Sequence, residues 1–462
     1  MQPVNRLLPE ILTLCATFVS DIDPRPIVSL THVCRYWRKS ITSSPRNWAS
    51  ITTLWKRLIP LCIERAGAVP LAVGIVVPDV KGNSSFFKAL LPHVARVAHL
   101  SLIGYFSIET LADDLPGFFT SPMPNLTSLE LEQAANPIQP FPSCEAPVPP
   151  VFQNVSRLKS LHLTRTPLYP ALFGITSLVE LKLIGPNTHF HFGTFVEFLA
   201  SNPNLEIADL DVSFAEDSVR TAPARMSSLV RLRHLSITCG KLDDTNGLLS
   251  RIHFPRGICL EVSCPDTTLG SSSWLPSFRT HIRGILAPFT TVRFRASPGE
   301  THVSGTNGSL SLRYSTTELY WHPTFFLFPA TSVREFHVNV SPWVFTPEIL
   351  VFILTQFPAL ETLVVAEVTS FATGTFDQLA GQSPLCPSLK TIAFFNCELT
   401  AGELEEFEGV VAKRRSSAVA WLYRVVIISS TGALPDYTLI QRLRQHVPCV
   451  NVGVDDKLPD LS

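Results

Sequence analysis

Residues 158–163 read Leu-Lys-Ser-Leu-His-Leu, and residues 178–183 repeat the same apolar spacing as Leu-Val-Glu-Leu-Lys-Leu. In an extended strand, the fourth and sixth residues of this word point to one face, and the residue between them points to the other. The word therefore predicts a strand that buries two leucines and presents a polar side chain on its opposite face.

The same word recurs along most of the chain. Five copies keep the pattern Leu-x-x-Leu-x-Leu closely and four are degenerate, with first residues at Val97, Leu126, Leu158, Leu178, Leu205, Leu232, Val333, Leu360 and Leu389. Neighbouring first residues lie 29 positions (97 to 126), 32 (126 to 158), 20 (158 to 178) and 27 (178 to 205) apart. Such periods are typical of repeats in which each unit supplies one strand and one helix or looser return.

Proline marks the start of many units. It stands two residues before the first apolar anchor at Pro124, Pro203, Pro358, Pro387 and Pro448, where it ends a preceding helix and favours extended backbone. Two such helices are predicted at residues 192–201 and 347–356, so that helix, proline and strand form a right-handed coil. The pattern resembles that of leucine-rich-repeat proteins. The resemblance implies an α/β solenoid with a parallel β-sheet on the concave face and helices outside.

Three regions depart from the simple repeat. Three copies extend to the longer form of the repeat, and the resemblance implies that Cys397 in one of them bonds the turn between units. Between residues 250 and 325, alternating apolar residues predict strands without the full word, so irregular repeats with longer loops are expected, or else an inserted domain. Six prolines between residues 137 and 150 predict a surface loop, with a ligand for a proline-recognising module as the alternative.

The first fifty residues have a different pattern. Residues 5–52 predict three short helices: the first carries an apolar stripe that includes Leu7 and Ile11, and a second, over residues 27–44, places Val33 and Trp37 on one face. A segment this small cannot bury so many large side chains by itself. We therefore expect part of the stripe to dock into a groove on another protein, with a plain helical cap on the solenoid as the alternative.

Three words in this segment carry a family resemblance. LLPEIL (7–12), VCRYWRKS (33–40) and SPRNWASI (44–51) resemble an F-box, particularly the F-box-like variety common in mushroom-forming fungi. The resemblance implies binding to the Skp adaptor of SCF-type cullin–RING ubiquitin ligases. Leu8 stands where the family usually has its first proline, which loosens the entry to the helix. The adaptor contacts carried over from the family are Leu7, Pro9, Ile11, Val33, Cys34, Trp37 and Trp48.

These patterns divide the chain into three parts. An F-box domain is expected at residues 1–54, a leucine-rich-repeat domain at 55–455, irregular at 250–325, and a short tail at 456–462. Residues 1–54 hold six basic and three acidic side chains, an excess that would suit an acidic partner.

Composition excludes several classes of protein. The 462 residues are 45% apolar and 16% charged, with a formal net charge of −1, so charge gives no reason to expect nucleic acid or an anionic membrane as a partner. The sequence shows neither a signal peptide nor an apolar run of membrane length. A cytoplasmic or nuclear protein is therefore expected, in which the ten cysteines are thiols rather than disulfides.

The sequence offers no set of catalytic residues. A glycine-rich phosphate loop, a serine elbow and a zinc-type Cys/His cluster are all missing from it. His189 and His191 are expected to be an ordinary surface or half-buried pair rather than metal ligands, and Lys413–Arg415 a solvated helix end, with a nuclear signal as the alternative. We therefore predict no catalytic residue, metal or cofactor.

Three hypotheses follow. The leading one is a non-catalytic substrate-recognition subunit, whose F-box recruits the Skp adaptor and through it cullin, while the concave repeat face binds an unknown target protein. The second is a leucine-rich-repeat scaffold without a ubiquitin-ligase role. The third, an enzyme, would need a convergent polar site that the sequence does not offer.

Overall fold

The computed structural model defines most of the helices and strands and leaves out some of the segments between them. The residues that it describes are 7–22, 25–77, 84–106, 117–134, 152, 155–166, 168, 172–185, 189–214, 227–238, 242–253, 255, 258–264, 291–297, 300–305, 308–314, 332–339, 346–372, 374–379, 386–416, 421–429 and 437–453. The Pro-rich segment 137–150 and the tail 456–462 lie outside these ranges.

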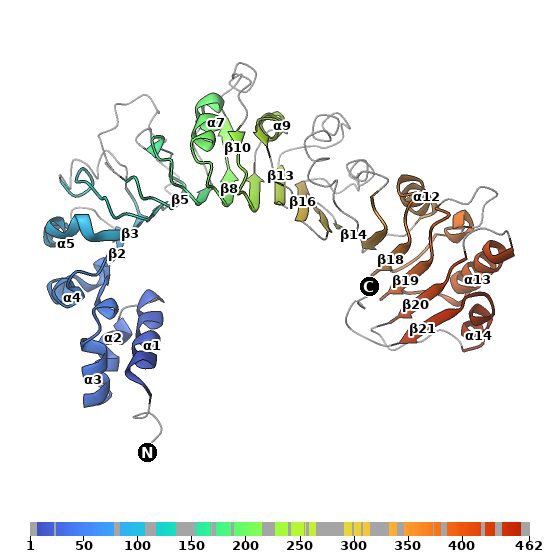
Figure 1. The fold of residues 1–462 in the computed structure, drawn as a ribbon, viewed down its shortest axis with the longest axis horizontal. Helices are drawn as coiled ribbons and strands as arrows, with labels where there is room; N and C mark the ends of the chain where they lie inside the picture. The colour runs from blue at the N-terminus through green and yellow to red at the C-terminus, as the bar shows by residue number, and fades with distance from the viewer. Residues whose placement is uncertain are drawn as a thin grey trace. The chain divides into compact units, whose positions relative to one another are not determined.

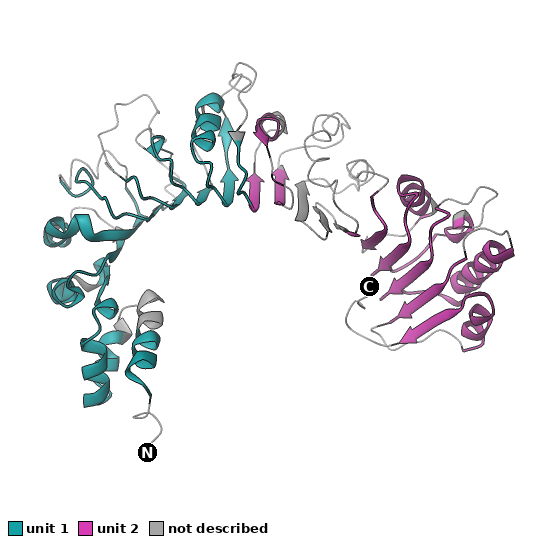
Figure 2. Ribbon diagram, viewed as in Figure 1, with its two compact units in different colours: residues 1–232 teal, residues 233–462 magenta. Residues whose placement is uncertain are grey.

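The chain forms two compact units, residues 1–232 and residues 233–462 (Figure 2). Each unit contains its own run of repeat strands. The sequence placed a boundary at residue 54, whereas the strand β1 (Ser50–Thr52) is already hydrogen bonded to β2 (Leu71–Val77) as part of the sheet of the first unit. The N-terminal helices therefore lead into the sheet without an intervening linker.

Three helices precede the sheet: α1 (Pro9–Ile22), α2 (Arg25–Thr31) and α3 (Arg35–Thr42), followed by a 3-10 turn at Pro45–Trp48. The number of helices agrees with the sequence prediction, but the single helix predicted over residues 27–44 is wrong. Cys34 has extended backbone (φ −160°, ψ 172°), and its Sγ accepts a hydrogen bond from the backbone N–H of Trp37 at 3.5 Å. This cap starts a new helix at Arg35, because an extended residue cannot continue the preceding one.

In the first unit, the strands follow one another in chain order and pair in parallel. After β1 and β2 come β3 (Val97–Gly104), β4 (Ser128–Gln133), β5 (Ser160–Thr164), β6 (Glu180–Ile184) and β8 (Ile207–Asp211). The connections contain α4 (Ile59–Ala66), α5 (Ser84–Leu90) and α7 (Phe192–Ala200), which lie on one side of the strands (Figure 1). Short strands β7 (His189–Phe190) and β9 (Ser213–Phe214) pair with each other.

The leucines of the repeat word form the core of the first unit. Leu129, Leu161, Leu181 and Ala208 stand in one row across β4, β5, β6 and β8, and Leu131, Leu163, Leu183 and Leu210 stand in the next. All eight side chains are buried, as is the first leucine of each word. A cluster of phenylalanines, Phe87, Phe118, Phe119 and Phe152, fills the space between successive connections with ring centroids 5.0–5.9 Å apart. The predicted α/β repeat fold is confirmed.

The second unit repeats this arrangement at its carboxyl end. β17 (Glu335–Asn339), β18 (Thr362–Ala366), β19 (Thr391–Phe395), β20 (Arg424–Ile428) and β21 (Cys449–Gly453) are parallel neighbours. Helices α12 (Pro347–Gln356), α13 (Ala401–Ser416) and α14 (Tyr437–His446) lie in the connections. The helices predicted from the sequence at 192–201 and 347–356 are confirmed as α7 and α12.

The region between residues 250 and 325 contains a local reversal of the sheet. After β11 (His234–Thr238), α9 (Leu242–Leu249) and β13 (Cys259–Cys264) come β14 (Thr291–Ser297), β15 (Glu300–Gly305) and β16 (Gly308–Tyr314). β15 pairs antiparallel with both neighbours, while β16 is parallel to β13 and β14 is parallel to β17. Because the meander pairs with β13 on one side and β17 on the other, its strands continue the sheet.

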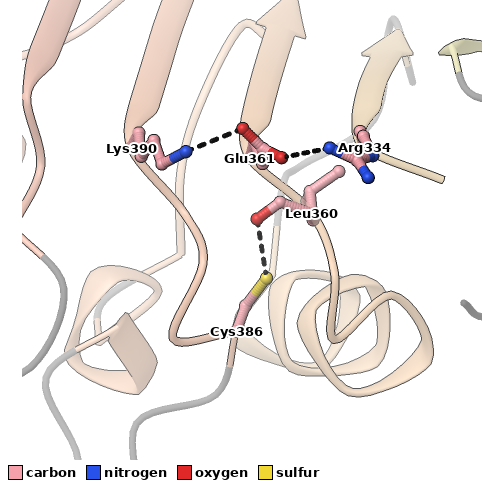
Figure 3. A network of polar contacts seen from close by, with 5 residues as sticks. All are labelled: Arg334, Leu360, Glu361, Cys386 and Lys390. Carbon is pink, nitrogen blue, oxygen red and sulfur yellow. Dashed lines mark hydrogen bonds and ion pairs between the residues drawn. The ribbon is translucent and has the colours of Figure 1, made fainter.

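Polar side chains bond the backbone between neighbouring repeats. Cys397 Sγ contacts the carbonyl oxygens of Val365 at 3.3 Å and Phe395 at 3.6 Å, and Thr166 Oγ1 does the same with Leu131 and Thr164. The predicted turn role of Cys397 is therefore confirmed. Figure 3 shows a second case, in which the buried thiol of Cys386 lies 3.3 Å from the carbonyl oxygen of Leu360.

Arg414 departs from the sequence prediction. The run Lys413–Arg415 was expected to be a solvated helix end, and Lys413 and Arg415 are exposed on α13. Arg414, however, is buried and donates hydrogen bonds to the carbonyl oxygens of Leu379 at 3.1 Å and Cys386 at 3.0 Å. A guanidinium carries several donors on a long stem, so one side chain can satisfy carbonyl groups of two turns.

In the part of the chain described here, no helix combines the length and the apolar character needed to cross a bilayer.

Candidate partner-binding surfaces

Helix α1 has two apolar faces, and only one of them is used inside the molecule. Leu12 and Ala16, one turn apart, are buried against the other two helices. Ile11 and Leu14 on α1, and Leu7 two residues before its start, have i, i+4, i+7 spacing, and all three are exposed. A helix in a soluble protein normally turns polar residues toward water, so this exposed stripe is available to a partner.

The other predicted contact residues surround this stripe to different degrees. Val33, between α2 and α3, is exposed, and so is Pro9 at the start of α1. Cys34 and Trp37 are half-buried, and the indole Nε1 of Trp37 is buried without a hydrogen-bond partner. The hydroxyl of Tyr36 donates to the carbonyl oxygen of Leu7 at 2.7 Å, which fixes the start of α1 against α3. Six of the seven predicted contacts have exposed or half-buried side chains in one three-helix segment: Leu7, Pro9, Ile11, Val33, Cys34 and Trp37.

Trp48 has a different environment. Its side chain is buried, its Nε1 donates to the carbonyl oxygen of Ile41 at 3.2 Å, and the guanidinium of Arg65 lies 4.4 Å from its ring centroid. The neighbouring Asn47 Nδ2 donates to the same carbonyl oxygen. Trp48 therefore joins the three helices to α4 and the first strand, and its ring is not on the exposed surface.

The face of the first unit's sheet that lies opposite the helices is polar. We call it the unit 1 open face and define it by the outward positions of four strands: Ser128, Glu130 and Glu132 on β4, Ser160, His162 and Thr164 on β5, Glu180, Lys182 and Ile184 on β6, and Ile207, Asp209 and Asp211 on β8. These twelve positions hold five carboxylates and one lysine. The surface is therefore acidic and suits a basic protein segment.

Ser160, His162, Glu180 and Lys182 form a hydrogen-bonded cluster on this face. Glu180 Oε1 lies 2.8 Å from Lys182 Nζ and 3.2 Å from His162 Nε2, and Glu180 Oε2 accepts from Ser160 Oγ at 3.1 Å. Burial by itself would raise the pKa of Glu180, but the hydrogen bond from Lys182 and the nearby His162 and Ser160 outweigh it, so the pKa is lowered. Glu180 is therefore ionised at neutral pH.

The cluster contains the residue types of a catalytic triad without its geometry. In a triad, one ring nitrogen of histidine faces the serine and the other faces the acid. Here His162 Nε2 is the nitrogen that lies near both Ser160 Oγ, at 3.1 Å, and Glu180, at 3.2 Å. One nitrogen cannot take a proton from serine while it is held by the acid, so these four side chains do not have the arrangement of a catalytic triad.

The two aspartates of β8 have separate roles. Asp211 Oδ2 accepts a hydrogen bond from the backbone N–H of Gly185 at 2.8 Å, at a turn where Gly185 has φ +66°. Burial, and then the charge of Asp209, raise the pKa of Asp211, against the lowering effect of the Gly185 hydrogen bond. Asp211 thus bonds a turn, whereas Asp209 stands beside Lys182 in the middle row of the open face.

The corresponding face of the second unit differs in its middle row. There His337, Val364, Ala393 and Val426 stand in register across β17 to β20. We call Val364, Ala393 and Val426 the apolar strip; they are 0%, 2% and 3% exposed and pack with the half-buried Ile428. The repeat word does not predict this strip, because Leu363–Val365 and Val425–Ile428 are continuous apolar runs in which no alternation between faces is visible. Such runs are themselves a signal, since strands buried on both faces have them.

Charges lie at the starts of these strands. Glu361 stands between Arg334 and Lys390, with Oε1 3.0 Å from Arg334 Nη1 and Oε2 2.9 Å from Lys390 Nζ (Figure 3). The hydrogen bond from Lys390 is the main cause that lowers the pKa of Glu361. These exposed ion pairs align the strand ends, and each stabilises the fold only slightly.

The comparisons with known proteins do not identify a family for this chain. No protein-family model matches the chain, and no curated protein matches it. Among solved structures, one similar chain is a Bacteroides fragilis protein whose crystal structure was determined as a structural-genomics target. It is 10% identical, the match covers 79% of this chain and 76% of that one, and the TM-score is 0.21. A likeness this distant gives no information on what the chain binds.

Proposed function

We propose that this chain is the substrate-recognition subunit of an SCF-type ubiquitin ligase. In this proposal, helices α1 to α3 are the F-box and bind the Skp adaptor, and the open faces of the repeat sheet bind a target protein. The observation that carries the proposal is that Leu7, just before α1, and Ile11 and Leu14 on it are exposed, although α1 already buries Leu12 and Ala16. An internal cap would have needed only the buried stripe.

The energetics favour docking at this stripe. Covering a large aliphatic side chain contributes about 1.5–3 kcal/mol, and Leu7, Ile11, Leu14 and Val33 are all exposed. The half-buried Trp37, whose indole Nε1 has no hydrogen-bond partner, adds an aromatic anchor of the kind that dominates protein interfaces. The excess of basic over acidic residues among residues 1–54 would speed association with an acidic adaptor.

The repeat sheet supplies the second half of the proposal. Its strands present rows of side chains that differ from repeat to repeat, which gives an extended surface for a partner. On unit 1 this surface is acidic, and we propose that it selects a target through a basic segment. Target and adaptor would then be held by different parts of one chain, as transfer of ubiquitin to the target requires.

Paired valine substitutions test the adaptor assignment. Val33, in the helical segment, is 57% exposed, and Val230, near the end of the same unit, is 63% exposed, so Val33→Asp and Val230→Asp introduce the same charge at similarly accessible positions. Co-purification of each full-length variant with the Skp adaptor is measured against the unsubstituted chain. We expect Val33→Asp to reduce retention of the adaptor by about 100-fold, because an unpaired charge in a dry interface costs several kcal/mol. Val230→Asp should retain it.

The outcomes separate the two functions. Loss of adaptor binding in both variants would mean that the change is not specific to the helical segment. If the unsubstituted, folded chain does not bind the adaptor at all, the ligase role is excluded, and the chain is a repeat scaffold that binds a partner through its open faces.

A further inference from the structure

A glycine stands in the interior of β2 at a position where the local structure does not require one. Gly74 lies between Val73 and Ile75, whose side chains are buried in the core, so a side chain at this position would point to the opposite face of the sheet. The backbone of Gly74 is not in the left-handed region, and a Cβ added to it would meet no heavy atom nearer than 3.9 Å. Glycine weakens a strand interior and often marks a site that a ligand or another backbone approaches closely.

The cross-strand neighbours of Gly74 are small, and exposed aliphatic side chains follow them. Gly74 stands in register with Thr52 on β1 and Ser101 on β3. Two residues further along, and therefore on the same face, Val76 and Ile103 are in register with each other and are 41% and 37% exposed. We call five residues the Gly74 platform: Thr52, Gly74, Val76, Ser101 and Ile103. None of the five is charged, and two of them expose aliphatic surface to a partner.

The Gly74 platform is continuous with the acidic unit 1 open face. Because β3 pairs with β4, Ser101 is in register with Glu130, and Ile103 with Glu132. Glu132 already has an ion-pair partner, whereas among the described residues Glu130 has none. Neighbouring strands are about 4.8 Å apart, so Glu130 lies about 10 Å from Gly74, across two strand spacings. An aliphatic surface and a carboxylate are thus held at a fixed separation on one face.

We propose that the Gly74 platform receives one bulky apolar side chain of the target's basic segment, and that Glu130 pairs with a lysine or arginine of the same segment. An extended chain rises about 3.3 Å per residue, so about 10 Å corresponds to about three residues. The recognised segment therefore combines a bulky apolar residue with a basic residue about three positions away.

Each part of the platform has a role in this proposal. Gly74 leaves room for the apolar side chain, Val76 and Ile103 are covered by it, and Glu130 attracts the basic residue. The inference rests on the proposed role of the unit 1 open face in target binding. It does not depend on the adaptor role of the N-terminal helices.

Two fluorescein-labelled peptides test the platform. The first, Gly-Ser-Trp-Gly-Ser-Arg-Arg-Gly, carries a tryptophan three positions before an arginine, and the second has alanine in place of the tryptophan. Binding of each peptide to the full-length chain is measured by fluorescence anisotropy. We expect the alanine peptide to bind the unsubstituted chain about tenfold more weakly, because its apolar contact with the platform is lost.

Gly74→Leu should remove this difference, because the new side chain occupies the space over the platform while the backbone can accept it. Both peptides should then bind as weakly as the alanine peptide binds the unsubstituted chain, a coupling that places the tryptophan at this position. Gly174→Leu, at an exposed glycine of the same unit whose added Cβ meets nothing within 4 Å, is the matched control and should keep the difference. Glu130→Lys should weaken binding of both peptides by about tenfold.

Ile103→Ser covers the case in which Gly74→Leu does not fold, as judged by circular dichroism. It removes an exposed aliphatic side chain from the platform, and we expect it to reduce the difference between the peptides to less than about threefold. Persistence of the full difference in folded Gly74→Leu, or in Ile103→Ser where Gly74→Leu does not fold, would overturn the apolar site.

The remaining outcomes separate this inference from the proposed function. If the apolar site is overturned while Glu130→Lys still weakens both peptides, the open face retains its role of binding a basic segment. If neither peptide binds the unsubstituted chain at concentrations up to about 1 mM, the inference is wrong. Co-purification with the Skp adaptor tests the ligase role independently of both results.

Discussion

At the scale of single residues, stability depends on buried polar side chains that form hydrogen bonds with backbone groups of their own repeat and of the neighbouring one. Asn202 is buried, and its amide makes three such bonds: Oδ1 accepts from Leu178 N–H at 3.1 Å, and Nδ2 donates to the carbonyl oxygens of Ile175 at 3.0 Å and Phe198 at 2.9 Å. In the second unit, the side chains of Cys386 and Arg414 likewise form hydrogen bonds with backbone carbonyl oxygens. These hydrogen bonds connect the turns of neighbouring repeats outside the strands, where the backbone bonds of the sheet are absent.

Substitution of Asn202 by alanine should destabilise the chain strongly. It leaves one N–H and two carbonyl groups without their side-chain partner in a buried position, and each unsatisfied group costs about 1–3 kcal/mol. We expect the free energy of unfolding to fall by about 2–4 kcal/mol, measured by urea denaturation. Asn204→Ala, at an exposed position two residues away, is the control and should change it by less than about 0.5 kcal/mol. An equal effect of both variants would contradict this role for Asn202.

The thiol of Cys386 predicts a loss of stability at alkaline pH. Burial raises the pKa of Cys386 from its ordinary 9.0 to about 11, so the folded state keeps the neutral thiol while the unfolded state loses its proton above about pH 9. The free energy of unfolding therefore falls as the pH rises from about 9 towards 11, by at most about 1.4 kcal/mol per pH unit for this group. Cys386→Ser keeps a donor that does not titrate there.

We expect Cys386→Ser to have a shallower alkaline loss than the unsubstituted chain in urea titrations between about pH 8 and pH 11. Cys15→Ser, at an exposed cysteine, is the matched control and should leave the slope unchanged. Parallel curves for Cys386→Ser and the unsubstituted chain would show that the buried thiol does not titrate as described.

At the scale of elements, the strands β4, β5, β6 and β8 of the first unit have one face in the core and one face on the open side of the sheet. Leu181 and Lys182 are adjacent on β6, yet Leu181 is fully buried in the core row and Lys182 is one-third exposed beside Glu180. This division is what lets the repeat change its outer residues without loss of fold. In α1 the same division fails, because Ile11 and Leu14 are exposed on a helix that buries Leu12 and Ala16, and for this reason we propose it as the surface that docks to the adaptor.

Leu181→Ala and Lys182→Ala should therefore have opposite profiles. Leu181→Ala creates a cavity in a fully packed row, and we expect the free energy of unfolding to fall by about 2–5 kcal/mol. Lys182→Ala removes one half-exposed ion pair and should change it by less than about 1 kcal/mol. Urea denaturation measures both, and similar losses in the two variants would mean that the two faces are not separate.

At the scale of the whole molecule, contacts run mainly between neighbouring repeats within each compact unit. Repeat proteins of this kind have a stability that is close to a sum of neighbour terms, so damage stays near its origin. We expect Leu181→Ala to lower hydrogen-exchange protection in β4 to β8 while the amides of β18 to β20 keep theirs. Uniform loss of protection across both units would instead show that the chain unfolds as a single cooperative body.

The sequence alone predicted much of this. Nine repeat words predicted strands, and each coincides with a strand of the structure, from β3 to β19. It also predicted two helices, the turn role of Cys397 and the number of N-terminal helices. It missed the break at Cys34, because a cysteine cap has no strong sequence signal, and it missed the antiparallel meander, because alternation in β14 to β16 gives no strand direction. The burial of Arg414 depends on carbonyl groups of turns about 30 residues away.

What the sequence determined is the repeat itself, since apolar residues at fixed spacing can be buried only if strands stack in order with their leucines on one face. What the tertiary structure decided is which of the other apolar residues are exposed and which are buried. Leu7, Ile11 and Val33 are exposed while Trp48 is buried, and Val364, Ala393 and Val426 are buried on a face where the first unit is polar. Spacing fixes the face on which a side chain lies, but only the assembled neighbours fix whether that face meets water, and both candidate surfaces depend on this second property.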